Sequence, residues 1–257
     1  LQSQKEPAMD CFASKANKST VTLIPVTEGG LKELLETYSA SVQDWVAANG
    51  YKATPGSVLM LPGDAGRPDE ALVGIAADGP DKWSWGAAAI RLPEGRYALP
   101  KGMETEDAEA AGLGWALGSY RFDRYAKKGG PLSKLVLPTS ADRKTVEETA
   151  KAIYLVRDLI NTPASDMGPG ELAHEARKLA RTFKCKIDIT VGDDLLSENY
   201  PMVHAVGRAS TRAPRLIDMV WGKAKHPKVT LIGKGVCFDS GGLDLKTSGG
   251  MLMMKKD

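Results

Sequence analysis

The sequence has few of the residues that mark several large classes of protein. Its three cysteines, Cys11, Cys185 and Cys237, are odd in number and far apart, which argues against a disulfide framework and favours a reducing, cytoplasmic location. No apolar run approaches membrane-spanning length. The 34 basic and 32 acidic residues nearly balance, so no excess of charge indicates nucleic acid or an anionic membrane as a partner.

Several motifs are absent as well. The first eighteen residues have no apolar core of a secretory signal, and Leu1 in place of an initiating Met indicates processing or trimming. The three histidines do not have H-E-x-x-H spacing, and the phosphate-loop pattern G-x-x-x-x-G-K-[ST] is missing. What remains is an ordinary globular composition, 42% hydrophobic and 26% charged, over a length that predicts one or two domains.

The apolar pattern predicts an α/β fold, because strands and helices alternate along the chain. We expect a smaller N-terminal α/β domain over residues 1–139, then an α/β domain with a central mixed sheet from residue 140, incomplete at Asp257. Thr105 and Ser140 are the expected helix caps. The alternating residues 83–99 predict a strand with a hairpin turn. The remaining expected strands are 20–26, 58–61, 71–76, 135–137, 187–191 and 216–221, and the expected helices are 31–48, 105–120, 142–160 and 171–183.

The most informative stretch is the last 25 residues, G-K-G-V-C-F-D-S-G-G-L-D-L-K-T-S-G-G-M-L-M-M-K-K-D. The β-branched run at 229–232 before it predicts a buried strand. Ligands of α/β proteins usually bind just past the end of such a strand. Four charged residues stand out there: Lys234, Asp239, Lys246 and Asp257.

Two interpretations of these charges are open from the residues alone. Charged side chains in a glycine-rich loop are commonly solvated. Alternatively, two carboxylates and an amine suit one or two divalent cations, provided that burial beside the cations lowers the pKa of one lysine enough to make it neutral. A second lysine that stays protonated would stabilise the oxyanion of a tetrahedral intermediate.

The same stretch resembles the signature of the cytosolic leucyl aminopeptidases, a two-metal family that removes N-terminal residues from peptides. The resemblance consists of G-K-G, F-D-S-G-G, a hydrophobic-x-hydrophobic-Lys and Met-Lys-x-Asp, all in register. It implies that Lys234, Asp239 and Asp257 are metal ligands that also contact substrate. It further implies that Lys246 is the electrophilic catalytic lysine and that Met254 lines the pocket for the first side chain of the substrate.

The resemblance also implies peptide substrates with leucine-like first residues, two divalent ions and a homohexamer. Zinc or manganese suits a mixed nitrogen and oxygen shell, and magnesium or cobalt is an alternative. The family's second acidic motif, whose arginine holds a bicarbonate, is absent from this sequence. We therefore expect a fragment, a cleavage product or an incomplete sequence, and we expect the isolated chain to be inactive.

Two other interpretations compete with the peptidase. Asp239 to Gly242 reads D-S-G-G, as around the nucleophile of chymotrypsin-like proteases, but that site needs a histidine base and an all-β fold, and neither is predicted here. The second alternative is an inactive fragment or a non-catalytic assembly subunit of the same fold. The mass and the metal content of the polypeptide in solution would distinguish it from the peptidase.

Overall fold

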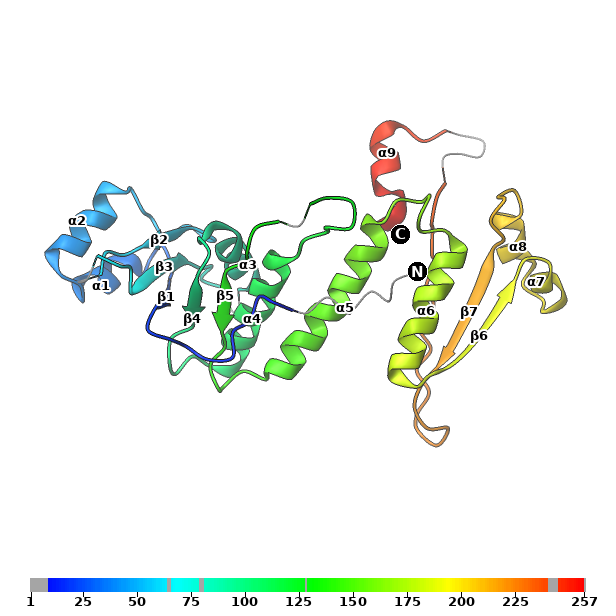
Figure 1. Cartoon of the computed structure of the whole chain (residues 1–257), viewed down its shortest axis with the longest axis horizontal. Coiled ribbons are helices and arrows are strands. Elements are labelled where there is room, and N and C mark those ends of the chain that lie inside the picture. Colours follow the sequence, from blue (N-terminus) through cyan, green and yellow to red (C-terminus); the bar gives the residue numbers. More distant parts are fainter. Residues whose placement is uncertain (1–8, 64–65, 79–80, 128, 240–244, 257) are drawn as a thin grey trace. The chain divides into compact units, whose positions relative to one another are not determined.

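The computed structural model describes residues 9–63, 66–78, 81–127, 129–239 and 245–256 (Figure 1). The chain forms two compact units, Leu1–Leu155 and Val156–Asp257, and the division falls inside the helix α5, Arg143–Asn161. The domain boundary expected at residue 140 stays a prediction, because a compact unit is not by itself a domain. Among the described residues, no helix is both long and apolar enough to cross a membrane.

A five-stranded mixed sheet forms the centre of the first unit, in the order β2–β3–β1–β4–β5. The central strand β1 pairs in parallel with β3 and β4, β4 pairs in parallel with β5, and β2 runs antiparallel to β3. This arrangement confirms the predicted α/β class. The strands are β1 (Thr20–Val26), β2 (Val58–Met60), β3 (Glu70–Gly74), β4 (Arg96–Ala98) and β5 (Lys134–Val136).

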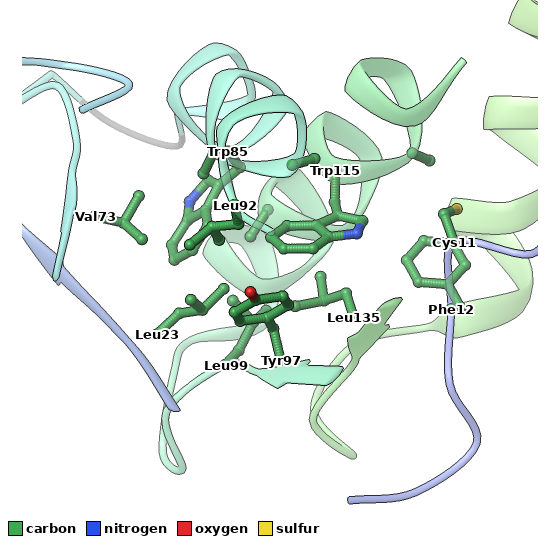
Figure 2. Close-up of a cluster of buried hydrophobic side chains, with 14 of the residues drawn as sticks. Cys11, Phe12, Leu23, Val73, Trp85, Leu92, Tyr97, Leu99, Trp115 and Leu135 are labelled. Atoms are coloured by element: carbon green, nitrogen blue, oxygen red, sulfur yellow. The ribbon is translucent and has the colours of Figure 1, made fainter. Parts of the chain in front are cut away.

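Both faces of this sheet are covered, because successive side chains of a strand point to opposite sides. In β3, Ala71 and Val73 belong to the larger core cluster, whereas Leu72 belongs to a smaller cluster on the other face. Figure 2 shows the larger cluster, in which the rings of Trp115 and Tyr97 lie 5.7 Å apart between helix and sheet. The smaller cluster packs against α1 (Leu31–Glu36) and α2 (Ala40–Ala48).

The segment after Asp81 is helical, so the strand pattern predicted over residues 83–99 is wrong for the first part of that range. It forms α3 (Lys82–Arg91), and only then does β4 follow. The Asp81 carboxylate begins this helix by accepting hydrogen bonds from the backbone N–H groups of Trp83 and Ser84 at 3.0 and 3.1 Å. Trp85, Ala88 and Ala89 of this helix are buried, which is helical rather than alternating spacing.

Other boundaries differ from the sequence pattern for local reasons. The helix expected over 31–48 is broken into α1 and α2, since Ser39 has an extended backbone. The helix α4 (Thr105–Ser119) has Glu104, not Thr105, at its N-cap. The first turn of α5 is capped by Asp142, which accepts from the N–H groups of Lys144 and Thr145, while the Ser140 hydroxyl bonds to a carbonyl elsewhere.

The second unit is built around α6 (Pro169–Phe183), which packs against the antiparallel pair β6 (Lys186–Val191) and β7 (Arg215–Val220) (Figure 1). The strand predicted at 216–221 is confirmed in place, but its residues are half-buried or exposed instead of buried. The remaining elements are α7 (Asp194–Ser197), α8 (Pro201–Gly207), α9 (Ser248–Met253) and the 3-10 turn η1 (Met254–Lys256).

The buried strand predicted at 229–232 is wrong for this structure. The segment has no strand hydrogen bonding, and Val229, Leu231 and Ile232 are 81–95% exposed. A strand needs a neighbour to pair with its backbone groups, and the described part of the second unit places none beside this run. The apolar pattern therefore identified a segment able to form a strand, while pairing decides whether it does.

Candidate functional site

The first half of the signature passes close to α6. A side chain at Gly235 would place its Cβ 2.9 Å from Cδ2 of Leu172 on that helix. Real Cβ atoms essentially never approach that closely, so any larger residue would force Leu172 to move. Glycine here lets the backbone that carries Lys234 lie directly against α6.

Asp239 and Lys246 form an ion pair, although seven positions separate them in the sequence. Their side chains are 38% and 34% exposed, so the pair is partly shielded from water. The Oδ1 atom of Asp239 is itself buried, and it contacts the ammonium without making a hydrogen bond of good geometry. The position of this oxygen is therefore set by the lysine beside it.

The second half of the signature is a short helix and a turn. Thr247, which follows Lys246, caps α9. Its hydroxyl accepts a hydrogen bond from the N–H of Gly250 at 3.3 Å, and its carbonyl oxygen accepts one from the N–H of Met251 at 3.0 Å. The cap fixes where α9 begins relative to Lys246. Met254 begins η1 and is half-buried.

Lys255 attaches η1 to the end of α5. Its Nζ donates to the carbonyl oxygen of Leu159 at 3.3 Å and also to that of Thr162. Burial lowers the pKa of Lys255, and the nearby thiol of Cys237 opposes that shift. The same ammonium is one of the charges that act on Cys237, whose pKa is raised chiefly by burial. The two halves of the signature therefore approach each other at Lys255.

The loop between α5 and α6 is held by Arg212. Its guanidinium donates to the carbonyl oxygens of Ala164 at 3.0 Å and Ser165 at 2.6 Å, and it lies 3.6 Å from the carboxylate of Glu171. The Glu171 carboxylate accepts hydrogen bonds from its own backbone N–H and from the N–H of Gly168. Both bonds lower the pKa of Glu171, and the bond from its own N–H has the larger effect. The loop is thus fixed at several carbonyls before α6 begins.

The structure brings together only part of the predicted site. Asp239 and Lys246 are in contact, whereas Lys234 is exposed and no described hydrogen bond or ion pair joins it to them. Asp257 lies outside the described residues. Within the described ranges there is no cluster of three or more His, Cys, Asp or Glu side chains able to hold a metal ion. The Asp239 carboxylate is of the kind that divalent cations prefer as a ligand, and the roles of all five residues stay predictions.

Sequence reasoning missed Lys255. The residue stands inside the Met-Lys-x-Asp motif but received no role, because a lysine in a charged run is usually solvated. A signal was present at the other end of the contact. Thr162 precedes Pro163, which has no N–H to continue the helix, so the carbonyls at this helix end need donors from elsewhere.

Comparisons with known proteins match both halves of the chain to one family. Residues 21–138 match the model of the M17 aminopeptidase N-terminal domain, and residues 154–257 match that of the cytosol aminopeptidase family catalytic domain. A probable cytosol aminopeptidase of Leifsonia xyli is 31% identical over 239 residues, covering 85% of this chain and 48% of the relative. Peptidase B of Yersinia pestis is 38% identical over 166 residues, covering 61% of this chain and 38% of the relative.

Solved structures agree with these matches. The crystal structure of a cytosol aminopeptidase from Coxiella burnetii is 44% identical with a TM-score of 0.87, covering 96% of this chain and 54% of that one. The bottromycin maturation enzyme BotP in complex with Mn is 29% identical with a TM-score of 0.73, covering 93% of this chain and 53% of that one. The chain spans about half the length of the curated relatives it matches. Both family models, the relatives and the shared fold lead to one conclusion: the chain belongs to the cytosol aminopeptidase family, M17.

Proposed function

We propose that the complete protein is a metal-dependent aminopeptidase that releases N-terminal residues, leucine-like ones preferentially, from peptides. Family membership supports the peptidase class. Because the chain spans about half of its relatives, the activity is proposed for the whole protein and not for this chain alone. The observation that carries the proposal is the contact of Asp239 with Lys246, which places an acid and a cation of the signature together.

The metal ligands proposed from this chain are Lys234, Asp239 and Asp257. The donor set of one amine and carboxylate oxygens favours zinc or manganese, with magnesium or cobalt as alternatives. BotP, which shares the fold, was solved in complex with Mn. When bound, two such ions would supply Lewis acidity and a water molecule of lowered pKa. Lys234, whose side chain is exposed in this structure, must be neutral to act as a ligand, and cations bound beside it would favour that form.

Lys246 is the proposed electrophile of the reaction. Its ammonium is held by Asp239 and its side chain is only 34% exposed, so it loses little freedom when a substrate arrives. It would donate a hydrogen bond to the carbonyl oxygen of the scissile bond and stabilise the negative charge that develops there. Met254, half-buried at the start of η1, is proposed to contact the first side chain of the substrate through its flexible thioether.

Three further features are proposals for the whole protein. They are a homohexameric assembly, a bicarbonate as general base and a cytoplasmic location. The family description of its members as cytosol aminopeptidases supports the location. Sedimentation velocity of the full-length protein would test the hexamer, since a monomer or dimer at micromolar concentration would contradict it.

Lys246→Ala in the full-length protein tests the catalytic proposal. We expect kcat for leucine p-nitroanilide to fall about 10²–10³-fold, the usual cost of one oxyanion donor, while the metal content stays near that of the wild type. Lys225→Ala is the control, because Lys225 is exposed and has no described side-chain partner. Loss of metal together with activity would make the role of Lys246 structural. A wild-type protein that neither hydrolyses the substrate nor retains a divalent metal would instead indicate a non-catalytic assembly subunit.

A further inference from the structure

A cavity of about 380 Å³ lies in the second unit, outside the signature. Its lining comes from three segments: the turn that follows β6, the end of α8, and the loop that leads into β7. None of the lining residues belongs to positions 233–257, where the proposed catalytic residues stand. The volume is near the lower end of the range for small-molecule pockets, about 300–1,000 Å³. The cavity therefore suits a small solute and not a long peptide.

The three segments are held together by hydrogen bonds. Gly192 has a left-handed φ of 58°, and its N–H donates to the carbonyl oxygen of Pro214 at 3.0 Å, which joins the first segment to the third. The helices α7 and α8 are neighbours (Figure 1), and Nε2 of His204 in α8 lies 3.0 Å from Oδ1 of Asp193. The carbonyl oxygen of His204 accepts from the N–H of Arg208 at 2.8 Å. Asp193 and Arg208 are thus both tied to His204, one through its ring and the other through its backbone.

Asp193 and Arg208 line this one cavity with opposite charges. Among the residues that the structure describes, no ion pair joins the two, and Asp193 pairs with His204 instead. The side chain of Asp193 is still 96% exposed, and Arg208 is exposed as well, so a ligand can reach both charges. Ser210 and Thr211 of the same lining add hydroxyl groups that can donate or accept. A ligand with one charge of each sign would satisfy both charged side chains at once.

We propose that this cavity binds a free α-amino acid with a small apolar side chain. The carboxylate of the amino acid lies on the guanidinium of Arg208, whose planar array of donors matches a carboxylate. Its ammonium donates to the carboxylate of Asp193, which His204 holds in place. The half-buried Ala213 and Pro214 supply the apolar part of the lining for the side chain.

The charges of the lining disfavour simpler ligands. An anion alone, such as phosphate, would meet the negative charge of Asp193, and a cation alone would meet the positive charge of Arg208. Free α-amino acids are the class of product that the proposed peptidase releases, but the cavity shares no residue with the proposed catalytic set. The inference therefore goes beyond the proposed function, and the binding can be measured without any turnover.

The test titrates L-alanine into the full-length protein by isothermal titration calorimetry, with two matched probes. Ethylamine is alanine without the carboxylate, and propionate is alanine without the ammonium. We expect each probe to bind about 10–100-fold more weakly than alanine, because one charge-assisted contact is lost. Alanine itself is expected to lose affinity by the same factor in Arg208→Gln and in Asp193→Asn. Arg181→Gln and Asp218→Asn change exposed residues of α6 and β7 that do not line the cavity, and these control variants are expected to keep the wild-type affinity.

The proposal is overturned if the wild-type protein binds no alanine at millimolar concentration. Propionate that binds as tightly as alanine would make the cavity an anion site, and unchanged affinity in both Arg208→Gln and Asp193→Asn would place the alanine elsewhere, so either result also overturns it. Both variants change exposed side chains, and circular dichroism checks their fold, while the two probes test the wild-type protein without any substitution. A protein that binds alanine in this way but hydrolyses no peptide would refute the proposed function alone. A protein that hydrolyses peptides without this binding would refute the present inference alone.

Discussion

The contact between α3 and α4 gives a sharp test of the packing, because glycines form it. A side chain at Gly118 of α4 would place its Cβ 2.8 Å from the Cα of Gly86 in α3, and closer still to the carbonyl oxygen of that residue. Both obstructing atoms are backbone, so no rotamer change can relieve them. The optimum separation of two carbon atoms is about 3.5–4.0 Å, so Gly118→Ala has to push the helices apart by about 1 Å.

The cost of that displacement falls on the larger core cluster. Trp85 on α3 and Trp115 on α4 are 2% and 0% exposed, and both pack against the sheet (Figure 2). Overpacking costs about 1–3 kcal/mol, and the rigid backbone contact puts Gly118→Ala near the upper end. Replacing Gly by Ala in a helix returns about 1 kcal/mol. The net expectation is a loss of about 2 kcal/mol, which lowers Tm by roughly 4–8 °C at about 2–4 °C per kcal/mol.

Gly112→Ala is the matched control within the same helix. Its Cβ would also approach to 2.8 Å, but the obstacle is Cδ2 of Leu137, the end of a flexible side chain. The helix-propensity gain is the same, so the difference between the two variants isolates the backbone clash. Thermal unfolding followed by tryptophan fluorescence measures it, since four of the five tryptophans lie in the first unit. Equal Tm values for Gly112→Ala and Gly118→Ala would refute the reasoning.

Two further predictions concern titratable groups of the first unit. Asp81→Ala is expected to cost about 1 kcal/mol by removing a helix cap, measured by urea unfolding at pH 7. Burial by itself would raise the pKa of Asp81, but hydrogen bonds from the N–H groups of Ala76, Ser84 and Trp83 outweigh it and lower that pKa. The stabilisation is therefore present above the ordinary value of 3.8 and is lost as pH falls through the folded pKa, so a difference from the wild type that persists undiminished at pH 2 would contradict it. Cys11 is 1% exposed and burial raises its pKa to about 12, so iodoacetamide at pH 8 should leave it unmodified in the native protein, as peptide mass mapping against the half-buried Cys185 can check.

The local sequence predicted a secondary-structure element correctly where one type of residue dominates the segment. The strand predicted at 20–26 is β1 to the residue, because its β-branched residues end in turn-forming ones on both sides. The prediction at 83–99 failed although a helical signal was present, since Asp81 is a capping residue placed before a run of alanines. The alternation of Trp83 and Trp85 misled the interpretation because only Trp85 is buried, whereas Trp83 is 70% exposed.

The candidate site also has a part that the sequence predicts and a part that it does not. The signature in the sequence was enough to name Lys234, Asp239, Lys246, Met254 and Asp257 as one set, since their spacing in the chain carries the resemblance. Nothing in that spacing shows that Asp239 meets Lys246, or that Lys255 crosses to the end of α5. Those contacts join residues 7 and 93 positions apart, and contacts of that kind depend on how the chain folds back.

The sequence by itself determined the α/β class, most of the strands and the family, because these follow from side-chain periodicity and from a motif that is continuous along the chain. Only the tertiary structure decided that residues 229–232 stay unpaired and that Lys255 anchors the last turn. The physical reason is that strand pairing and the satisfaction of a buried carbonyl each need a partner from elsewhere in the chain, and the local sequence does not specify which partner arrives.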